Sequence, residues 1–156
     1  MKSAPLSEEQ IIKKLESFCA YRERCESEVK QKLYQLAVDV KETDFYINYL
    51  KENNFLNEDR FIAAFARGKF NIKSRGKRKI IQELQVKRID SKKILQSIEN
   101  IDEGQYFVRL QDLLEKKLRT IKEIDVFKKK QKLMQYAMQK GYEMELIIEA
   151  LKEINL

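Results

Sequence analysis

Apolar residues recur at helical spacing along almost the whole sequence, and residues that interrupt helices are rare. The chain of 156 residues contains four glycines and one proline, whereas 43% of its residues are hydrophobic and 37% are charged. So few turn residues suit helices joined by short connections better than strands. The balance of charged and apolar residues is typical of a globular protein and not of a disordered one. We therefore predict an all-α fold.

Nine amphipathic segments can be placed on this pattern. Ser7 and Gln10 form a Ser-x-x-Gln capping box that starts the first, Asn57 is placed to cap the fourth, and Asp90 or Ser91 can cap the sixth. The positions expected to face inward are Ile11, Leu15, Phe18 and Cys19; Val29, Leu33, Leu36 and Ala37; Tyr46, Ile47 and Leu50; Phe61, Ala64 and Phe65; Ile80, Ile81 and Leu84; Ile94, Leu95, Ile98 and Ile101; Phe107, Leu110, Leu114, Leu118 and Ile121; Leu133, Met134, Ala137 and Met138; and Ile147, Leu151 and Ile154.

Three stretches of the sequence resemble one another at a period near fifty residues. They are Lys32–Val38, Glu83–Ile89 and Tyr136–Tyr142, offset by 51 and then 53 positions, and each ends one amphipathic helix before another begins. Units of three helices are too small to bury their apolar faces without a neighbour. We predict three tandem three-helix repeats, at 7–56, 57–101 and 102–156, within a single array over 1–156. The alternative is one irregular helical bundle in which the similarities arise by chance.

Positive charge is concentrated in the middle of the chain, in a segment we call the basic window. It holds eleven basic and two acidic residues, a net +9, whereas the whole chain is +7, so the remainder sums to −2. A concentrated field of one sign indicates a polyanionic partner, either nucleic acid or an acidic protein groove. The alternative is a solvated helix face. The basic residues of the window are Arg67, Lys69, Lys73, Arg75, Lys77, Arg78, Lys79, Lys87, Arg88, Lys92 and Lys93.

Catalytic and metal chemistry find little support in the sequence. There is no histidine, and Cys19 and Cys25 are six apart, which is not a redox or zinc spacing, so we expect two free, reduced thiols and neither metal nor cofactor. The four glycines are scattered and form no phosphate loop. With no recognisable catalytic motif, we expect that the protein is not an enzyme. No apolar run reaches the roughly 20 residues of a membrane span, and the start lacks an apolar signal stretch, so we expect a cytoplasmic protein.

Four blocks of the sequence, in register with the repeats, resemble the RecX family of regulators of the bacterial recombinase RecA. Arg22–Leu33 is similar to the Arg-x-Arg-Ser, Glu-Leu and Lys-Leu pattern of the first repeat, and Leu50–Phe61 to the block of the second that ends in Arg-Phe. Gly76–Ile89 is similar to the Gly-Pro-x-x-Ile-x-x-Glu-Leu-x-x-Lys-Gly-Ile block, and Gln139–Tyr142 to the third repeat. The resemblance covers about residues 10 to 156.

The resemblance implies a function as well as a fold. RecX proteins are elongated, curved arrays of helical repeats that bind along the RecA filament and inhibit ATP hydrolysis, strand exchange and coprotease activity. It therefore implies a monomeric modulator whose partners are the RecA filament and single- or double-stranded DNA within it. Two alternatives stay open: an autonomous nucleic-acid-binding helical module that needs no recombinase, and a generic helical scaffold.

The candidate contact residues lie mostly in the basic window. Arg75, Lys77, Arg78 and Lys79 come first, because they surround the predicted start of the fifth helix, where backbone amides also favour an anion. Arg60 has a structural alternative, a local ion pair. The full set is Arg60, Arg67, Lys69, Lys73, Arg75, Lys77, Arg78, Lys79, Lys87 and Arg88. A second cluster could extend it: Lys116, Lys117, Arg119, Lys122, Lys128, Lys129, Lys130 and Lys132.

Some positions depart from the family pattern, mostly at helix ends. Asn54 stands for a glycine and tolerates the left-handed conformation, whereas Arg88 stands for a glycine and requires another way to close its helix. Lys77 replaces a proline, which removes a start signal. Cys25 replaces a capping serine, which weakens that cap by about 1 kcal/mol unless Ser27 or a shifted start takes over. The seven tyrosines could stack on bases, but their helical spacing favours core packing.

Overall fold

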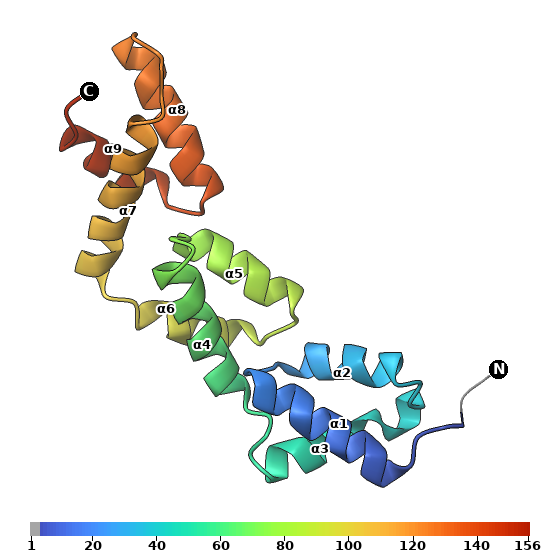
Figure 1. Ribbon diagram of the computed structural model, residues 1–156. Coiled ribbons are helices and arrows are strands. Elements are labelled where there is room, and N and C mark those ends of the chain that lie inside the picture. The colour runs from blue at the N-terminus through green and yellow to red at the C-terminus, as the bar shows by residue number, and fades with distance from the viewer. Residues whose placement is uncertain (1–3) are drawn as a thin grey trace. The chain divides into compact units, whose positions relative to one another are not determined.

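The computed structural model describes residues 4–156, and this part of the chain is helical, with no strand. The all-α prediction is confirmed. Within residues 4–156, nine α-helices and one short 3-10 helix follow one another (Figure 1). The helices are α1 (Glu8–Tyr21), α2 (Glu26–Gln35), η1 (Val40–Glu42), α3 (Thr43–Glu52), α4 (Glu58–Asn71), α5 (Lys77–Val86), α6 (Ser91–Glu99), α7 (Glu103–Leu118), α8 (Val126–Gln139) and α9 (Met144–Lys152).

Two compact units make up the described chain. The first, unit 1, runs to Ala64 and includes Lys87–Ile89. The second, unit 2, consists of Phe65–Val86 and Asp90–Leu156. In unit 1, α3 packs against both α1 and α2, and their apolar stripes form one core. That core includes Ile11, Leu15, Cys19, Val29, Leu33, Tyr46, Ile47, Leu50 and Leu56.

Unit 2 is built on two sets of packed helices. The helices α7, α8 and α9 pack against one another, and α5 packs against α6. The side chains of Leu110, Leu114 and Leu133 are fully buried there. Tyr106 and Tyr142, the two largest fully buried side chains, also belong to this unit.

Most helix ends follow the predicted chemistry. The Ser7 hydroxyl accepts a hydrogen bond from the Gln10 amide at 3.2 Å, and the Gln10 side chain accepts one from the Ser7 amide at 2.9 Å. The Asn57 side chain accepts from the Arg60 amide at 2.9 Å. Asn54 has a φ of 62°, so it ends α3 in the left-handed conformation as predicted. Arg88 has a φ of 60° and follows α5 in the same conformation, without a glycine.

The sequence placed some apolar residues wrongly. α6 ends at Glu99 and α7 at Leu118, so Ile101 and Ile121 lie beyond the helices they were assigned to. The amide of Ile101 donates to the carbonyl of Ile98 at 3.1 Å, a tight turn that closes α6 early. Leu95 and Met138 are 56% and 43% exposed, because the buried stripes of their helices are narrower than the apolar pattern suggests.

Cys19 and Cys25 are both buried and free, as expected of reduced thiols. Cys25 is the N-cap residue of α2, and the Glu28 carboxylate accepts a hydrogen bond from its amide at 3.1 Å. The Cys25 Sγ lies 3.2 Å from the Ser27 Oγ. The Cys25 thiol thus contacts the Ser27 hydroxyl, and Glu28 supplies its own half of a capping box by accepting from the Cys25 amide.

The tyrosines do not behave as one class. Tyr46, Tyr106 and Tyr142 are buried, which confirms core packing for these three. Tyr21 and Tyr34 are 84% and 81% exposed, so core packing was the wrong prediction for them. Both lie in the last turn of a helix, where helical spacing alone says little about which face is covered.

Candidate nucleic-acid and filament interface

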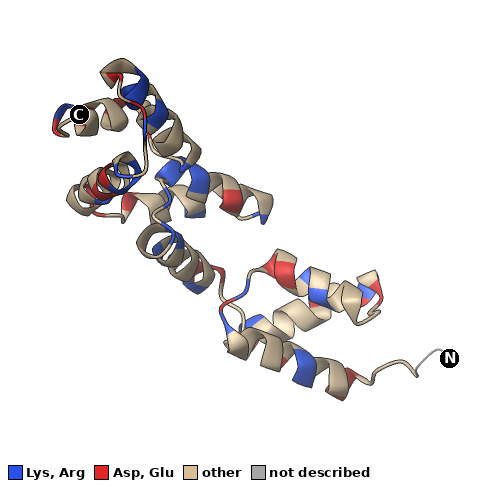
Figure 2. Ribbon diagram, turned by 45° about the horizontal axis from the view of Figure 1, so that its top comes forward, with Lys and Arg blue, Asp and Glu red and all other residues tan. Residues whose placement is uncertain are grey.

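The candidate residues fall in both compact units, and each group is described in its own unit. Arg67, Lys69, Lys73, Arg75, Lys77, Arg78 and Lys79 belong to unit 2, and Arg60, Lys87 and Arg88 to unit 1. Figure 2 shows Lys and Arg interleaved with Asp and Glu along the helices. The question for each cation is therefore whether a protein group already holds it.

Two buried tyrosines hold the turn that joins α4 to α5. The Tyr142 hydroxyl donates to the carbonyl of Ser74 at 2.9 Å. The Tyr106 hydroxyl accepts from the amide of Lys77 at 3.0 Å and donates to the Glu143 carboxylate at 2.9 Å. Burial raises the pKa of both phenols, so they stay protonated and can donate. The turn is thus fixed by side chains of α7 and of the connection between α8 and α9.

The same turn contacts a second turn, between α8 and α9, through its backbone. The Gly76 amide donates to the Lys140 carbonyl at 2.7 Å, and the Arg78 amide donates to the Gly141 carbonyl at 3.0 Å. A Cβ atom on Gly76 would lie 2.3 Å from the carbonyl carbon of Gly141, closer than such atoms approach. Gly141 has a φ of 99°, which favours glycine. Both turns therefore need glycine at their point of contact.

These bonds correct one expectation about the start of α5. The amides of Lys77 and Arg78 were expected to favour an anion. The structure shows that both already donate to protein oxygens, of Tyr106 and Gly141. These two amides are therefore not available to an anion.

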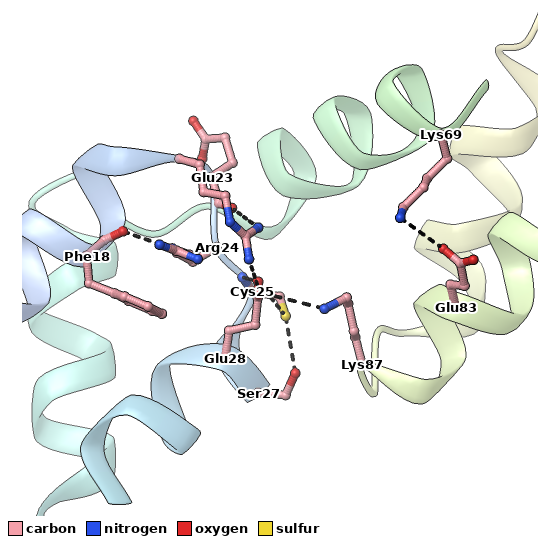
Figure 3. Close-up of polar contacts among 10 residues, drawn as sticks. Phe18, Glu23, Arg24, Cys25, Ser27, Glu28, Lys69, Glu83 and Lys87 are labelled. Atoms are coloured by element: carbon pink, nitrogen blue, oxygen red, sulfur yellow. Dashed lines mark hydrogen bonds and ion pairs between the residues drawn. The ribbon is translucent and has the colours of Figure 1, made fainter. Parts of the chain in front are cut away.

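One carboxylate in the basic window binds two of the candidate cations. Glu83 forms an ion pair with Lys69, Nζ to Oε2, at 3.6 Å (Figure 3). Its other oxygen pairs with Arg75. All three side chains are 25–29% exposed. The Arg75 amide also donates to the carbonyl of Lys69 at 3.0 Å. Lys69 and Arg75 thus have a structural role within unit 2.

The other candidates of unit 2 differ in how far the protein engages them. The Lys77 ammonium lies 4.6 Å from the centroid of the Tyr106 ring, and the Lys79 ammonium donates to the Gln139 carbonyl at 3.3 Å. Three further cations are exposed, and their side chains have no hydrogen bond or ion pair within residues 4–156. We call them the open basic set: Arg67, Lys73 and Arg78.

In unit 1 Arg60 forms an ion pair, as its structural alternative expected, but with a distant residue and not with a local one. Its Nε donates to the Glu23 carboxylate at 3.1 Å, and its Nη2 donates to the Asn54 carbonyl at 2.7 Å. Lys87 pairs with Glu28 at 3.6 Å and lies 5.9 Å from the Phe61 ring centroid. Arg88 is exposed. The partner of Arg60 is 37 positions away, which is why local spacing did not identify it.

The second basic cluster, between Lys116 and Lys132, lies on α7, α8 and their connection. Lys132 pairs with Glu123 at 3.9 Å, and Lys117 lies 4.8 Å from the Tyr136 ring centroid. Most of its other members are exposed. Its acidic neighbours make it a weaker source of field than the basic window.

Two other features, a metal centre and a membrane-spanning helix, have no counterpart in the described residues. Within residues 4–156, no group of three or more Cys, Asp and Glu side chains is arranged to hold a metal ion. In the same range, none of the helices is both long enough and apolar enough to cross a bilayer.

Comparisons with known proteins place the chain among regulatory proteins. Residues 57–97 match the pattern of the second three-helix domain of RecX, and residues 103–151 match that of the third. The Regulatory protein RecX of Clostridium beijerinckii is 31% identical over 84% of this chain and 62% of its own length. Those of Lactococcus lactis and Oceanobacillus iheyensis are 32% and 28% identical, over 89% and 88% of this chain. The chain spans about half the length of these last two relatives, 53% and 51%.

Solved structures show the same fold. A crystal structure of RecX from Lactobacillus salivarius matches with a TM-score of 0.83 and 20% identity, over 93% of this chain and 94% of that one. Another, of regulatory protein RecX, matches with a TM-score of 0.82 and 19% identity, over 98% and 81%. RecX is a family of regulatory proteins and not of enzymes, in agreement with the expectation from the sequence. The chain contains two family patterns in tandem, the relatives match most of it, and it shares the fold of the solved structures. The chain therefore belongs to the RecX family.

Proposed function

We propose that this chain binds the RecA–DNA filament and lowers its ATP hydrolysis, strand exchange and coprotease activity, as a regulator of DNA repair, recombination and the SOS response. Membership of the RecX family supports the regulatory role. We further propose that it acts as a cytoplasmic monomer built of three repeats, at 7–56, 57–101 and 102–156. The family patterns over 57–97 and 103–151 support the last two repeats.

The observation that carries the contact is the open basic set. Arg67, Lys73 and Arg78 are exposed cations without a hydrogen bond or ion pair in the described residues, so no intramolecular partner must be broken before they meet an anion. Lys69 and Arg75, by contrast, are held by Glu83. A filament offers both acidic protein surfaces and DNA phosphates, and exposed Lys and Arg bind either. We assign the first contact to the open basic set, with Lys77 and Lys79 beside it in sequence.

The test is RecA ATP hydrolysis on single-stranded DNA, measured as the chain is titrated in. We expect the wild type to slow hydrolysis and the triple variant Arg67→Ala, Lys73→Ala, Arg78→Ala to require a higher concentration for the same effect. The matched control is Lys30→Ala, Lys41→Ala, Lys152→Ala, which removes three exposed lysines outside the basic window. An unchanged hydrolysis rate with excess wild type would refute the proposed function.

A second arm separates filament binding from autonomous DNA binding. Salt-dependent binding of the chain to DNA is measured without RecA. If each cation of the open basic set meets a phosphate, the triple variant lowers the slope of log K against log salt by about 0.7–0.9 per lost contact. Inhibition that disappears while this slope is unchanged would place the contact on the recombinase protein. Equal inhibition by the triple variant and the control would move the contact away from the open basic set.

A further inference from the structure

An open groove of about 570 Å³ lies on unit 1, formed by α1, α2 and the segment between them. None of its lining residues belongs to the basic window. Cations and aromatic rings line it together with one serine, and no carboxylate does. Its basic and aromatic residues are Lys13, Lys14, Phe18, Tyr21, Arg24 and Lys32. We call it the α1–α2 groove.

Arg24 gives this groove a buried positive charge. It is 9% exposed and is the buried charged residue of the part that the structure describes. Its Nε donates to the Phe18 carbonyl at 2.9 Å, and its guanidinium carbon lies 3.7 Å from the Phe18 ring centroid (Figure 3). Within residues 4–156 it forms no ion pair, although the neighbouring Arg22 pairs with Glu28 at 2.7 Å. The Arg24 guanidinium is thus held by the carbonyl and the ring face of Phe18, and the Glu28 charge acts on it without forming an ion pair.

The remaining nitrogens of Arg24 are available to a ligand. Among the side-chain nitrogens of Arg24, Nε alone has a hydrogen-bond partner in the described residues. Every buried side-chain nitrogen of these residues has such a partner, so the two Nη atoms are not buried and reach solvent through the groove. Lys13 forms a long ion pair with Glu9, at 4.0 Å, and both side chains are highly exposed. Such a pair is weak, so the Lys13 ammonium is also available to a ligand in the groove. A guanidinium that is fixed at one edge and open at the other is well suited to a phosphate.

Tyr21 adds a feature that a simple anion site would not need. It is 84% exposed, and its ring lies 5.9 Å from the Arg24 guanidinium carbon. Lys13, Ser17 and Tyr21 are spaced by four residues on α1, so they lie along one face of the helix. Cations that follow a phosphate backbone, next to an exposed ring on which a base can stack, are the combination that binds single-stranded nucleic acid. A duplex keeps its bases stacked, and an acidic peptide has no base for the ring.

We propose that the α1–α2 groove binds single-stranded nucleic acid, with phosphate at Arg24 and the groove lysines and one base stacked on Tyr21. This site is a property of the chain alone and does not depend on the recombinase. It can therefore fail while inhibition of RecA stands, and it can hold if inhibition is absent.

The test is binding of a fluorescently labelled oligothymidylate, followed by anisotropy without RecA. We expect Tyr21→Ala to weaken binding by about 5- to 150-fold, the range found for loss of one stacked base. Tyr21→Phe keeps the ring and should bind within about two-fold of the wild type. Because Tyr21 is exposed, both variants are expected to fold, and circular dichroism checks this. An abasic oligonucleotide of equal length has the phosphates but no bases, so its binding should not change with Tyr21→Ala.

A charge variant tests the phosphate half of the site. Lys13→Ala, Lys14→Ala should reduce the dependence of log K on log salt by about 0.7 per lost phosphate contact. The control is Lys30→Ala, Lys41→Ala, which removes the same charge outside the groove and should leave the slope unchanged. Equal binding by wild type and Tyr21→Ala, or no binding by the wild type, would overturn the proposal. Displacement of the oligonucleotide by polyglutamate with equal potency in wild type and Tyr21→Ala would also overturn it, in favour of an acidic peptide.

Discussion

Replacing Gly76 by alanine should destabilise unit 2 strongly. The added Cβ would lie 2.3 Å from the carbonyl carbon and 2.4 Å from the carbonyl oxygen of Gly141. These are backbone atoms, so no flexible side chain can move aside, and the two turns must separate. Separation weakens the hydrogen bonds from Gly76 to Lys140 and from Arg78 to Gly141.

The size of the effect follows from these two terms. Overpacking of a closely packed site costs about 1–3 kcal/mol, and each weakened hydrogen bond costs about 1 kcal/mol. The free energy of unfolding should therefore fall by about 3–5 kcal/mol, a large part of the about 5–15 kcal/mol typical of a folded protein. For a chain of this length the melting temperature should fall by about 6–20 °C.

Thermal unfolding followed by far-ultraviolet circular dichroism measures this change. Gly68→Ala is the matched control, because a Cβ on Gly68, within α4, has no heavy atom within 4 Å. Alanine favours the helix over glycine, so that variant should gain about 0.5–1 kcal/mol. A Gly76→Ala melting temperature equal to the wild type, or an equal loss in both variants, would refute the reasoning from the turn contact.

Three further predictions concern residues of unit 1. Arg88→Gly should stabilise the protein by about 0.5–1 kcal/mol in urea unfolding, because Arg88 is held at a φ of 60° where glycine is not strained. Burial alone would raise the pKa of Glu28, but hydrogen bonds from the Cys25 amide and Arg22, and nearby positive charge, lower it below 4.5. The stabilisation by ionised Glu28 is thus present above pH 4.5 and lost as the pH falls through the lowered pKa. Glu28→Gln should therefore make the free energy of unfolding less dependent on pH in the acid range, and an equal dependence in the two proteins would contradict this. Burial raises the pKa of Cys19 to about 11 and also raises that of Cys25. Ellman's reagent should therefore react slowly with the native protein and fully with the protein unfolded in urea. A rapid reaction of the native protein would contradict the burial of these thiols.

The sequence predicted the fold well where the physics is local. The capping box at Ser7 depends on residues three apart, and the left-handed Asn54 depends on one side chain. Both could be predicted because no distant residue decides them. Arg88 marks the limit of such reasoning: the sequence showed that its helix lacks a glycine, and the structure shows that the arginine takes the glycine conformation itself.

The candidate site was harder to predict because distant residues decide which cations are open. Glu83 engages both Lys69 and Arg75, and Glu23 engages Arg60 from 37 positions away. Net charge in a sequence window cannot show these pairings. The exposed ring of Tyr21 was missed for a related reason, since its helical spacing is the same whether a neighbouring helix covers it or leaves it open.

The tyrosine contacts of the turn between α4 and α5 determine when, during translation, this turn can be fixed. Ser74 and Lys77 are bonded by Tyr142 and Tyr106, which come later in the chain. A nascent chain that has just emerged past α5 therefore has the basic residues of the turn but not the groups that fix it. Its positive surface reaches its final conformation only after Glu143 has left the ribosome, so a stalled or truncated product would display the same charges in an unfixed turn.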